Sequence, residues 1–263
     1  MMKIGFIGMG NMGSAMAAGA CRKFGAENVL FSVPDQEHGR SVSRETGMRF
    51  VLTNDQAARA DIVVLAVKPQ VYAAVAQEIR PVLSEESIVI SPAPGITIEN
   101  LSGMLGGHEK IARIMPNLAA KVGESMTGVT YSDALDEADR KAAGQFLASF
   151  GGVSEVAENL MDAVVCVSGS SPAYVYIFIE ALADSAVKYG ISRKDAVRMA
   201  AQTVLGAAKM VLETGEDPAV LKNAVCSPAG TTIQGVSALE EYGFRNAVIK
   251  ATDACYKKCT EIK

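Results

Sequence analysis

The sequence predicts an α/β protein in which a doubly wound sheet is followed by an all-α domain. Two observations lead to this prediction. Up to about residue 160, short apolar runs alternate with helical patterns, and beyond that point strand patterns cease. The expected domains are therefore 1–160 and 161–263.

The predicted strands of the first domain are mostly apolar along their whole length, as expected where helices cover both faces of a sheet. They are 3–8, 28–33, 62–67, 87–91 and 110–115, followed by 128–132 and 152–157. Helical patterns fall between them at 11–24, 36–47, 70–83, 97–106 and 136–149. This alternation predicts the βαβ units of a doubly wound fold.

The second half contains helical patterns with start and stop signals. A helix over 172–189 is apolar nearly all round, Ser192 is expected to cap the next helix up to Gly215, and Asp217–Pro218 begins a third. After a loop, a final pair of helices runs to Lys263. A domain of roughly 100 residues cannot bury such apolar helices by itself. We therefore expect a homodimer joined through this half.

Composition argues against several kinds of partner. The net charge is −4, Trp is absent and no basic run occurs, so no nucleic-acid partner is expected. The longest apolar runs are far shorter than the ~20 residues of a membrane span, so no membrane partner is expected either. Five cysteines without a CxxC motif, and only two histidines, predict no metal site and suit thiols in a reducing cytoplasm.

A glycine fingerprint, Gly8-x-Gly10-x-x-Gly13, follows the first strand and opens a helix. Gly8 permits a tight turn, Gly10 lets the backbone approach a pyrophosphate, and Gly13 allows close packing of the helix on the sheet. The diphosphate would lie near the amides of Asn11 and Met12 at the helix N-terminus. In this βαβ setting the motif predicts a Rossmann-type dinucleotide-binding domain. The alternative is a purely structural glycine turn.

The end of the second strand bears on cofactor choice. NAD preference would place an acid there, but Ser32 occupies the position and Asp35 comes only after a proline. Arg40 and Arg44 either neutralise a 2′-phosphate or form a solvated helix face. The missing acid favours NADP, with NAD as the alternative.

Two further strands end in similar loops, "AVKPQ" (66–70) and "SPAPG" (91–95). Pro69 ends the first strand, and Lys68 lies at the carboxyl edge, where ligands bind in open α/β sheets. If these strands are neighbours, their ends form one floor beneath a ligand. The alternative is that the prolines and glycines only end these strands and begin ordinary loops.

A loop in the helical half has the composition of an anion site. Ser227-Pro228-Ala229-Gly230 stops one helix, and Thr231-Thr232 starts the next. A helix N-terminus offers free amides and partial positive charge, which favour a carboxylate or phosphate. The alternative is a plain N-cap.

The chain resembles pyrroline-5-carboxylate reductases along essentially its whole length. The motifs that carry the resemblance are "GFIGMGNMG", "AVKPQ", "SPAPGITI", "SGSSPAYVYIFIEALADSAVKYG", "AAQTVLGAAKMVLETGEDPAVLK" and "SPAGTTIQGVSALEEYGFRNAVIKA". The resemblance implies reduction of 1-pyrroline-5-carboxylate to L-proline with NAD(P)H, the last step of proline biosynthesis. It also implies a homodimer with interleaved helical domains, assembled further into a decamer of five dimers.

The resemblance also implies the site residues. Cofactor-binding positions are Ile7, Gly8, Met9, Gly10, Asn11, Met12, Ser32, Asn54, Ala66, Val67, Lys68, Pro69 and Ala93. The substrate carboxylate is expected on Ser227, Gly230, Thr231 and Thr232, and Thr232 is the catalytic residue that hydrogen-bonds the ring nitrogen. Ala229 and Ser171 replace glycines that are usual in the family.

Two other functions are alternatives. A β-hydroxyacid dehydrogenase has a similar fingerprint, but it carries a catalytic lysine where "SGSSPAYVYIFIEAL" has none. A non-catalytic NADP-sensing protein is the second alternative, although an intact substrate loop would then have no purpose.

Overall fold

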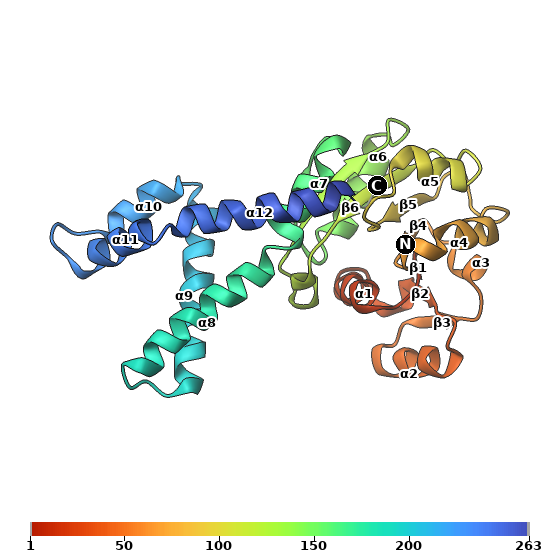
Figure 1. Cartoon of the computed structure of the whole chain (residues 1–263). Helices are drawn as coiled ribbons and strands as arrows, with labels where there is room; N and C mark the ends of the chain where they lie inside the picture. The colour runs from red at the N-terminus through yellow and green to blue at the C-terminus, as the bar shows by residue number, and fades with distance from the viewer. Residues whose placement is uncertain (1, 262–263) are drawn as a thin grey trace. The chain divides into compact units, whose positions relative to one another are not determined.

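The computed structural model describes residues 2–261 (Figure 1). They form two compact units. The first comprises the chain up to Gly169 together with the residues from Tyr256 onward, and the second is Ser170–Cys255.

The first unit is built on one eight-stranded sheet with the order β3-β2-β1-β4-β5-β6-β7-β8. Its strands are β1 Ile4–Ile7, β2 Val29–Ser32, β3 Arg49–Val51, β4 Ile62–Leu65, β5 Ile88–Ser91, β6 Ile111–Met115, β7 Ser125–Tyr131 and β8 Gly151–Glu155. The strands from β3 to β6 are parallel, β7 is antiparallel to β6, and β8 is parallel to β7. The order extends to both sides of β1 and β4, which makes the sheet doubly wound.

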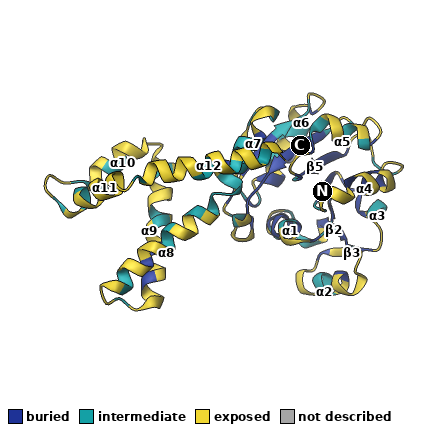
Figure 2. Cartoon of the chain, in the orientation of Figure 1, coloured by how far each residue is buried: buried dark blue, intermediate teal, exposed yellow. Residues whose placement is uncertain are grey.

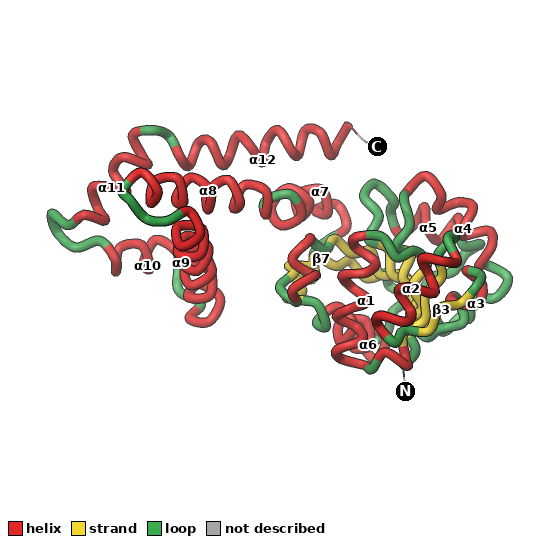
Figure 3. Tube along the Cα trace, turned by 90° about the horizontal axis from the view of Figure 1, so that it is seen from below, coloured by secondary structure: helices red, strands yellow, loops and turns green. Residues whose placement is uncertain are grey.

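Helices cover both faces of this sheet (Figure 3). Successive strand residues point to opposite faces, so Phe6 packs in one core cluster and Ile7 in the other. α1 (Asn11–Phe24) and α6 (Glu137–Leu147) contribute Met16 and Phe146 to the cluster around Phe6. The cluster around Ile7 is covered by α3 (Asn54–Ala57), α4 (Tyr72–Ile79) and α5 (Ile98–Met104). α2 (Gln36–Thr46) packs beside β3.

The second unit consists of helices. They are α8 Pro172–Lys188, α9 Arg193–Thr214, α10 Pro218–Val225, α11 Thr231–Glu241 and most of α12 Phe244–Glu261; α7 (Met161–Val164) and a π-helical turn (Val165–Gly169) precede them. The predicted caps are confirmed. Ser192 Oγ accepts from the Asp195 amide at 3.2 Å, Asp217 Oδ1 accepts from the Ala219 amide at 2.7 Å, and Gly215 ends α9 with φ of 67°. The expected helix end at Lys263 lies outside the described residues.

Little of this helical unit is buried (Figure 2). Its one core cluster of buried residues, among those described, is Ala183, Ala196 and Ala200 between α8 and α9. Large apolar side chains face outward, with Ile177 65% and Leu212 84% exposed. Such faces predict a covering partner.

One helical stretch, Glu158–Lys188, has the length and apolar composition that would let it cross a membrane, and only 6% of its most apolar window is buried. The same properties suit a helix that packs against a second copy of the chain.

Candidate active site

The glycine turn after β1 has the backbone form that the fingerprint predicts. Gly8 has φ of 96°, and its amide donates to the Ser32 carbonyl at 3.0 Å. A Cβ on Gly13 would lie 2.6 Å from the Gly8 carbonyl oxygen, so α1 can approach the turn only with glycine there. A Cβ on Gly10 would meet nothing within 4 Å, which leaves its backbone open to a ligand. Contact with a cofactor stays a prediction.

The start of α1 offers unpaired backbone donors. Gly10 is the N-cap and makes no side-chain capping bond, and the first turn contains no acidic residue. The first amides, including those of Asn11 and Met12, therefore face outward with the positive end of the helix dipole. Ile7 and Met9 flank the turn with buried side chains. This arrangement suits a pyrophosphate.

The two further loops lie at the same sheet edge. β4 pairs with both β1 and β5, so the condition that these strands be neighbours is met. The Ala66 amide donates to the Ile7 carbonyl at 2.9 Å, which joins the "AVKPQ" loop to the glycine turn. Val67 is half-buried, Lys68 and Pro69 are exposed, and Ala93 is buried beneath.

A buried tyrosine, not predicted from the sequence, holds these strand ends together. Tyr72 Oη donates to the Leu65 carbonyl at 2.6 Å and lies 3.1 Å from Ser91 Oγ. The Ala93 amide in turn donates to Ser91 Oγ at 3.4 Å. Burial raises the pKa of Tyr72, so the hydroxyl stays protonated as a donor. The sequence signal that could have revealed this role is the tyrosine itself, because a buried tyrosine hydroxyl needs a hydrogen-bond partner.

The end of β2 carries a chain of polar contacts. Ser32, 2% exposed, donates through Oγ to Asn54 Oδ1 at 2.7 Å, and Asn54 Nδ2 donates to Glu78 Oε2 at 2.7 Å. Asp35 is occupied elsewhere, because Oδ1 accepts the amides of Glu37 and His38 as the cap of α2. The acid hydrogen-bonded into this chain of contacts is therefore Glu78 of α4, which the sequence interpretation missed.

The two arginines of α2 bond along their own helix. Arg40 Nη2 donates to Gln36 Oε1 at 3.2 Å, and Arg44 Nε donates to the Arg40 carbonyl at 3.2 Å. Both side chains are exposed, and the two alternatives for them, a solvated helix face and neutralisation of a 2′-phosphate, stay predictions.

In the second unit, the loop before α11 forms a tight turn in which the Gly230 amide donates to the Ser227 carbonyl at 3.1 Å. Gly230 is the N-cap of α11 and makes no side-chain capping bond, and the first turn has no acid. Among the described residues, neither Thr231 nor Thr232 uses its hydroxyl in a hydrogen bond. No side-chain capping bond therefore supports a plain N-cap among the described residues. The amides at the start of α11 and the hydroxyls of Thr231 and Thr232 remain available for a ligand.

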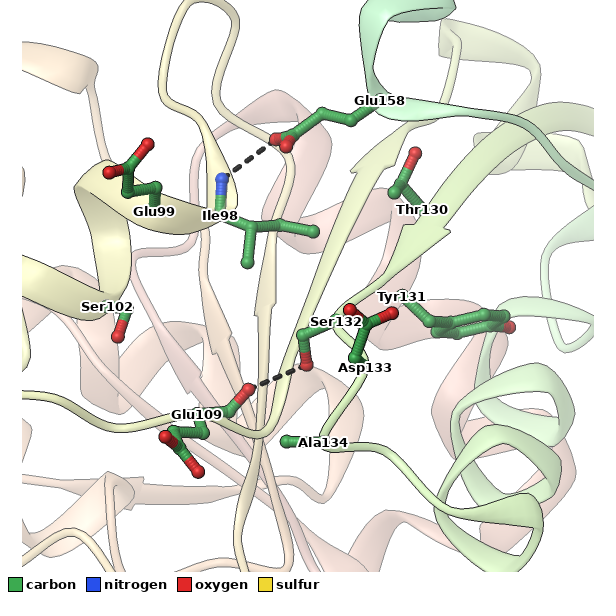
Figure 4. Close-up of a pocket in the computed structure, with 10 residues that line it drawn as sticks. All are labelled: Ile98, Glu99, Ser102, Glu109, Thr130, Tyr131, Ser132, Asp133, Ala134 and Glu158. Atoms are coloured by element: carbon green, nitrogen blue, oxygen red, sulfur yellow. Dashed lines mark hydrogen bonds between the residues drawn. The ribbon is translucent and has the colours of Figure 1, made fainter.

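A wide surface hollow of about 690 Å³ lies elsewhere in the first unit, between the start of α5, the loop before β6 and the end of β7 (Figure 4). Glu99, Glu109, Asp133 and Glu158 line it. Glu158 Oε1 is already engaged by the Ile98 amide at 2.8 Å and by Arg113 Nη1 at 3.1 Å. Four carboxylates disfavour the phosphates of a dinucleotide, and none of the predicted site residues lies here.

No disulfide joins any of the five cysteines. Cys255 and Cys259 lie four residues apart on α12. The expected absence of a metal stays a prediction.

Comparison with known proteins gives matches to both halves. Residues 158–262 match the family described as pyrroline-5-carboxylate reductase dimerisation, and residues 3–95 match NADP oxidoreductase, coenzyme F420-dependent. A pyrroline-5-carboxylate reductase of Escherichia coli K12 is 43% identical over 99% of this chain and 98% of its own. One from Methanosarcina acetivorans is 43% identical over 95% of this chain and 96% of its own.

Solved structures agree. A pyrroline-5-carboxylate reductase from Coxiella burnetii has a TM-score of 0.93 at 33% identity and covers 100% of this chain and 98% of its own. A Plasmodium falciparum pyrroline carboxylate reductase with NADP bound has a TM-score of 0.85 at 34% identity, covering 98% and 97%. A Mycobacterium tuberculosis 3-hydroxyisobutyrate dehydrogenase, covering 88% of this chain and 77% of its own, has a TM-score of 0.53 at 19% identity and shares the fold alone.

The fold and its sheet-edge site, with these matches, define an NADP-dependent oxidoreductase with a Rossmann-type half and a helical dimerisation half. Within that class, the chain belongs to the pyrroline-5-carboxylate reductase family.

Proposed function

We propose that this chain reduces 1-pyrroline-5-carboxylate to L-proline, the last step of proline biosynthesis, with NADPH as the reductant and NADH as the alternative. The observation that carries the proposal is the start of α11. Among the described residues no side chain caps its amides and its threonine hydroxyls make no hydrogen bond, its first turn has no acid, and the other half of the chain has a glycine turn that suits a dinucleotide.

The substrate carboxylate binds at the N-terminus of α11. Free amides and the helix dipole favour an anion there, and the hydroxyls of Ser227 and Thr231 add donors beside Gly230. Holding the carboxylate fixes the orientation of the ring, so that the imine presents one defined face.

Thr232 donates its hydroxyl to the ring nitrogen, which gains electron density during reduction. NADPH, when bound, supplies the hydride to the imine carbon. Because threonine is a poor acid, the proton on nitrogen comes from solvent or is already on the imine. The contribution of Thr232 is orientation and electrostatic stabilisation.

The cofactor is held by the turn from Ile7 to Met12, by Ser32 and Asn54, and by the loop Ala66–Pro69 with Ala93. The open space at Gly10 and the free amides at the start of α1 fit a pyrophosphate. Pyrophosphate binding there leaves the strand ends of β4 and β5 to support the reacting end.

Residues 1–160 serve as the cofactor domain, and residues 161–263 as the dimerisation and substrate domain. The exposed apolar faces of α8 and α9 support pairing with a second copy, and a decamer of five such dimers is the further assembly. Neither a membrane nor a nucleic acid takes part. Thiols without disulfides suit a cytoplasmic enzyme.

A comparison of substrates tests the proposal. Oxidation of NADPH is followed with pyrroline-5-carboxylate, and reduction of NADP is followed with 3-hydroxy acids. We expect turnover with the cyclic imine only. Turnover with 3-hydroxy acids would favour the dehydrogenase alternative, and cofactor binding without turnover of either would favour the sensor.

A further inference from the structure

The polar chain at the end of β2 has a fixed direction. Asn54 contacts two oxygens, Ser32 Oγ and Glu78 Oε2, each at 2.7 Å. A carboxylate only accepts hydrogen bonds, so the amide must turn Nδ2 toward Glu78. Its Oδ1 then faces Ser32, and the serine must donate its only proton to it.

This direction decides what Ser32 offers a ligand. With its proton committed to Asn54, the serine oxygen presents lone pairs alone. A ribose 2′-hydroxyl can donate to those lone pairs, whereas a 2′-phosphate needs donors. The negative charge of Glu78 further opposes a phosphate dianion.

We propose that Glu78 is a specificity-determining residue which, through Asn54 and Ser32, lowers the preference of this chain for NADPH relative to NADH. Glu78 acts as a positioning residue. It accepts a hydrogen bond from Asn54 and influences the ligand through Asn54 and Ser32. It takes the place of the acid that NAD-preferring folds carry at the end of the second strand, but it comes from α4. The inference rests on the dinucleotide site proposed above.

Glu78→Gln is the informative variant. Glutamine keeps the length of the side chain, removes the charge and pairs with Asn54 in either direction. Reversing the amide releases the Ser32 proton for a phosphate oxygen. The freed serine proton can donate to the 2′-phosphate and the opposing charge is gone, so we expect the NADPH-to-NADH affinity ratio to rise roughly tenfold, which corresponds to about 1.4 kcal/mol.

Two further variants sharpen the test. Glu78→Asp keeps the charge but shortens the reach, so it should move the ratio in the same direction by a smaller factor. Glu85→Gln is the matched control, because Glu85 is also an exposed acid, lies in the loop between α4 and β5, and has no ion pair among the described residues. Its ratio should equal that of the wild type.

The measurement is the dissociation constant of each cofactor without substrate, by titration calorimetry, followed by kcat/KM with each cofactor. Wild-type protein that binds neither cofactor would overturn the proposed function itself. Wild-type protein that binds both, with an unchanged ratio in Glu78→Gln, would overturn only the role of Glu78. A shift in Glu78→Gln with a wild-type ratio in Glu78→Asp would also contradict the hydrogen-bond chain, because charge alone would then explain the effect.

Discussion

Thr232 occupies the second position of α11, after the N-cap Gly230, and within the described residues its hydroxyl has no protein partner. Thr232→Ala should therefore change stability little, well below the ~1 kcal/mol of a lost cap. If the hydroxyl bonds the imine nitrogen as charge develops, kcat should fall about tenfold to a hundredfold. Steady-state kinetics and a melting curve check this.

The control is Thr231→Ala, one position earlier, which should have a milder effect on kcat. The affinity for NADPH should barely change in either variant, since the phosphates contact the other half of the chain. Wild-type kcat with a lowered melting temperature in Thr232→Ala would return the loop to a capping role.

Ala229 is the one described residue other than glycine with a positive φ, 56°. The left-handed region costs an L-residue roughly 1–2 kcal/mol, partly offset by the greater chain entropy that glycine loses on folding. Ala229→Gly should therefore raise stability by about 0.5–1 kcal/mol and the melting temperature by ~1–4 °C, at unchanged kcat. A lower melting temperature in calorimetry at fixed protein concentration would show that the loop is relaxed as it stands.

Two substitutions in the glycine turn before α1 separate a loss of cofactor binding from a loss of stability. Gly10→Ala places a methyl group in open space, so the fold should persist while the KM for NADPH rises at least about tenfold. Gly13→Ala drives a methyl group within 2.6 Å of the Gly8 carbonyl, which should destabilise the protein by about 1–3 kcal/mol. Melting curves and cofactor titrations of both variants check the contrast. Equal loss of stability in both would contradict a ligand-facing role for Gly10.

The long helices and strands were predictable because their buried positions carry apolar residues in a recognisable pattern along the sequence. Strands such as Ile62–Leu65 are apolar throughout because helices cover both faces. β3 was missed because only Val51 of its three residues is buried, and α3, with four residues, is too short to show a period. The antiparallel pairing of β6 and β7 depends on chain direction, which composition does not encode.

The candidate site was also predictable only in part from the sequence. Backbone features such as the turn at Gly8 were visible as motifs, because glycine marks a required conformation. Contacts between side chains were not, because Asn54 and Glu78 are 24 residues apart and on different helices. Only the fold brings them together.

At the scale of the molecule, the helical unit depends on a partner. Its core cluster of three alanines, among the described residues, is too small to offset the entropy of ordering five helices. We expect dissociation and unfolding of this unit to be coupled, so the melting temperature should rise with protein concentration. Calorimetry over a hundredfold dilution series, with native mass spectrometry, checks this. A folded, active monomer with a constant melting temperature would contradict it.

The proposed activity is the transfer of hydride from NADPH to the imine carbon of pyrroline-5-carboxylate. The most direct test supplies NADPH deuterated at the transferred position of the nicotinamide ring and analyses the product by mass spectrometry. We expect L-proline carrying one deuterium on the former imine carbon, with formation slowed in Thr232→Ala. Proline without deuterium, or no proline at all from a chain that binds NADPH, would contradict it.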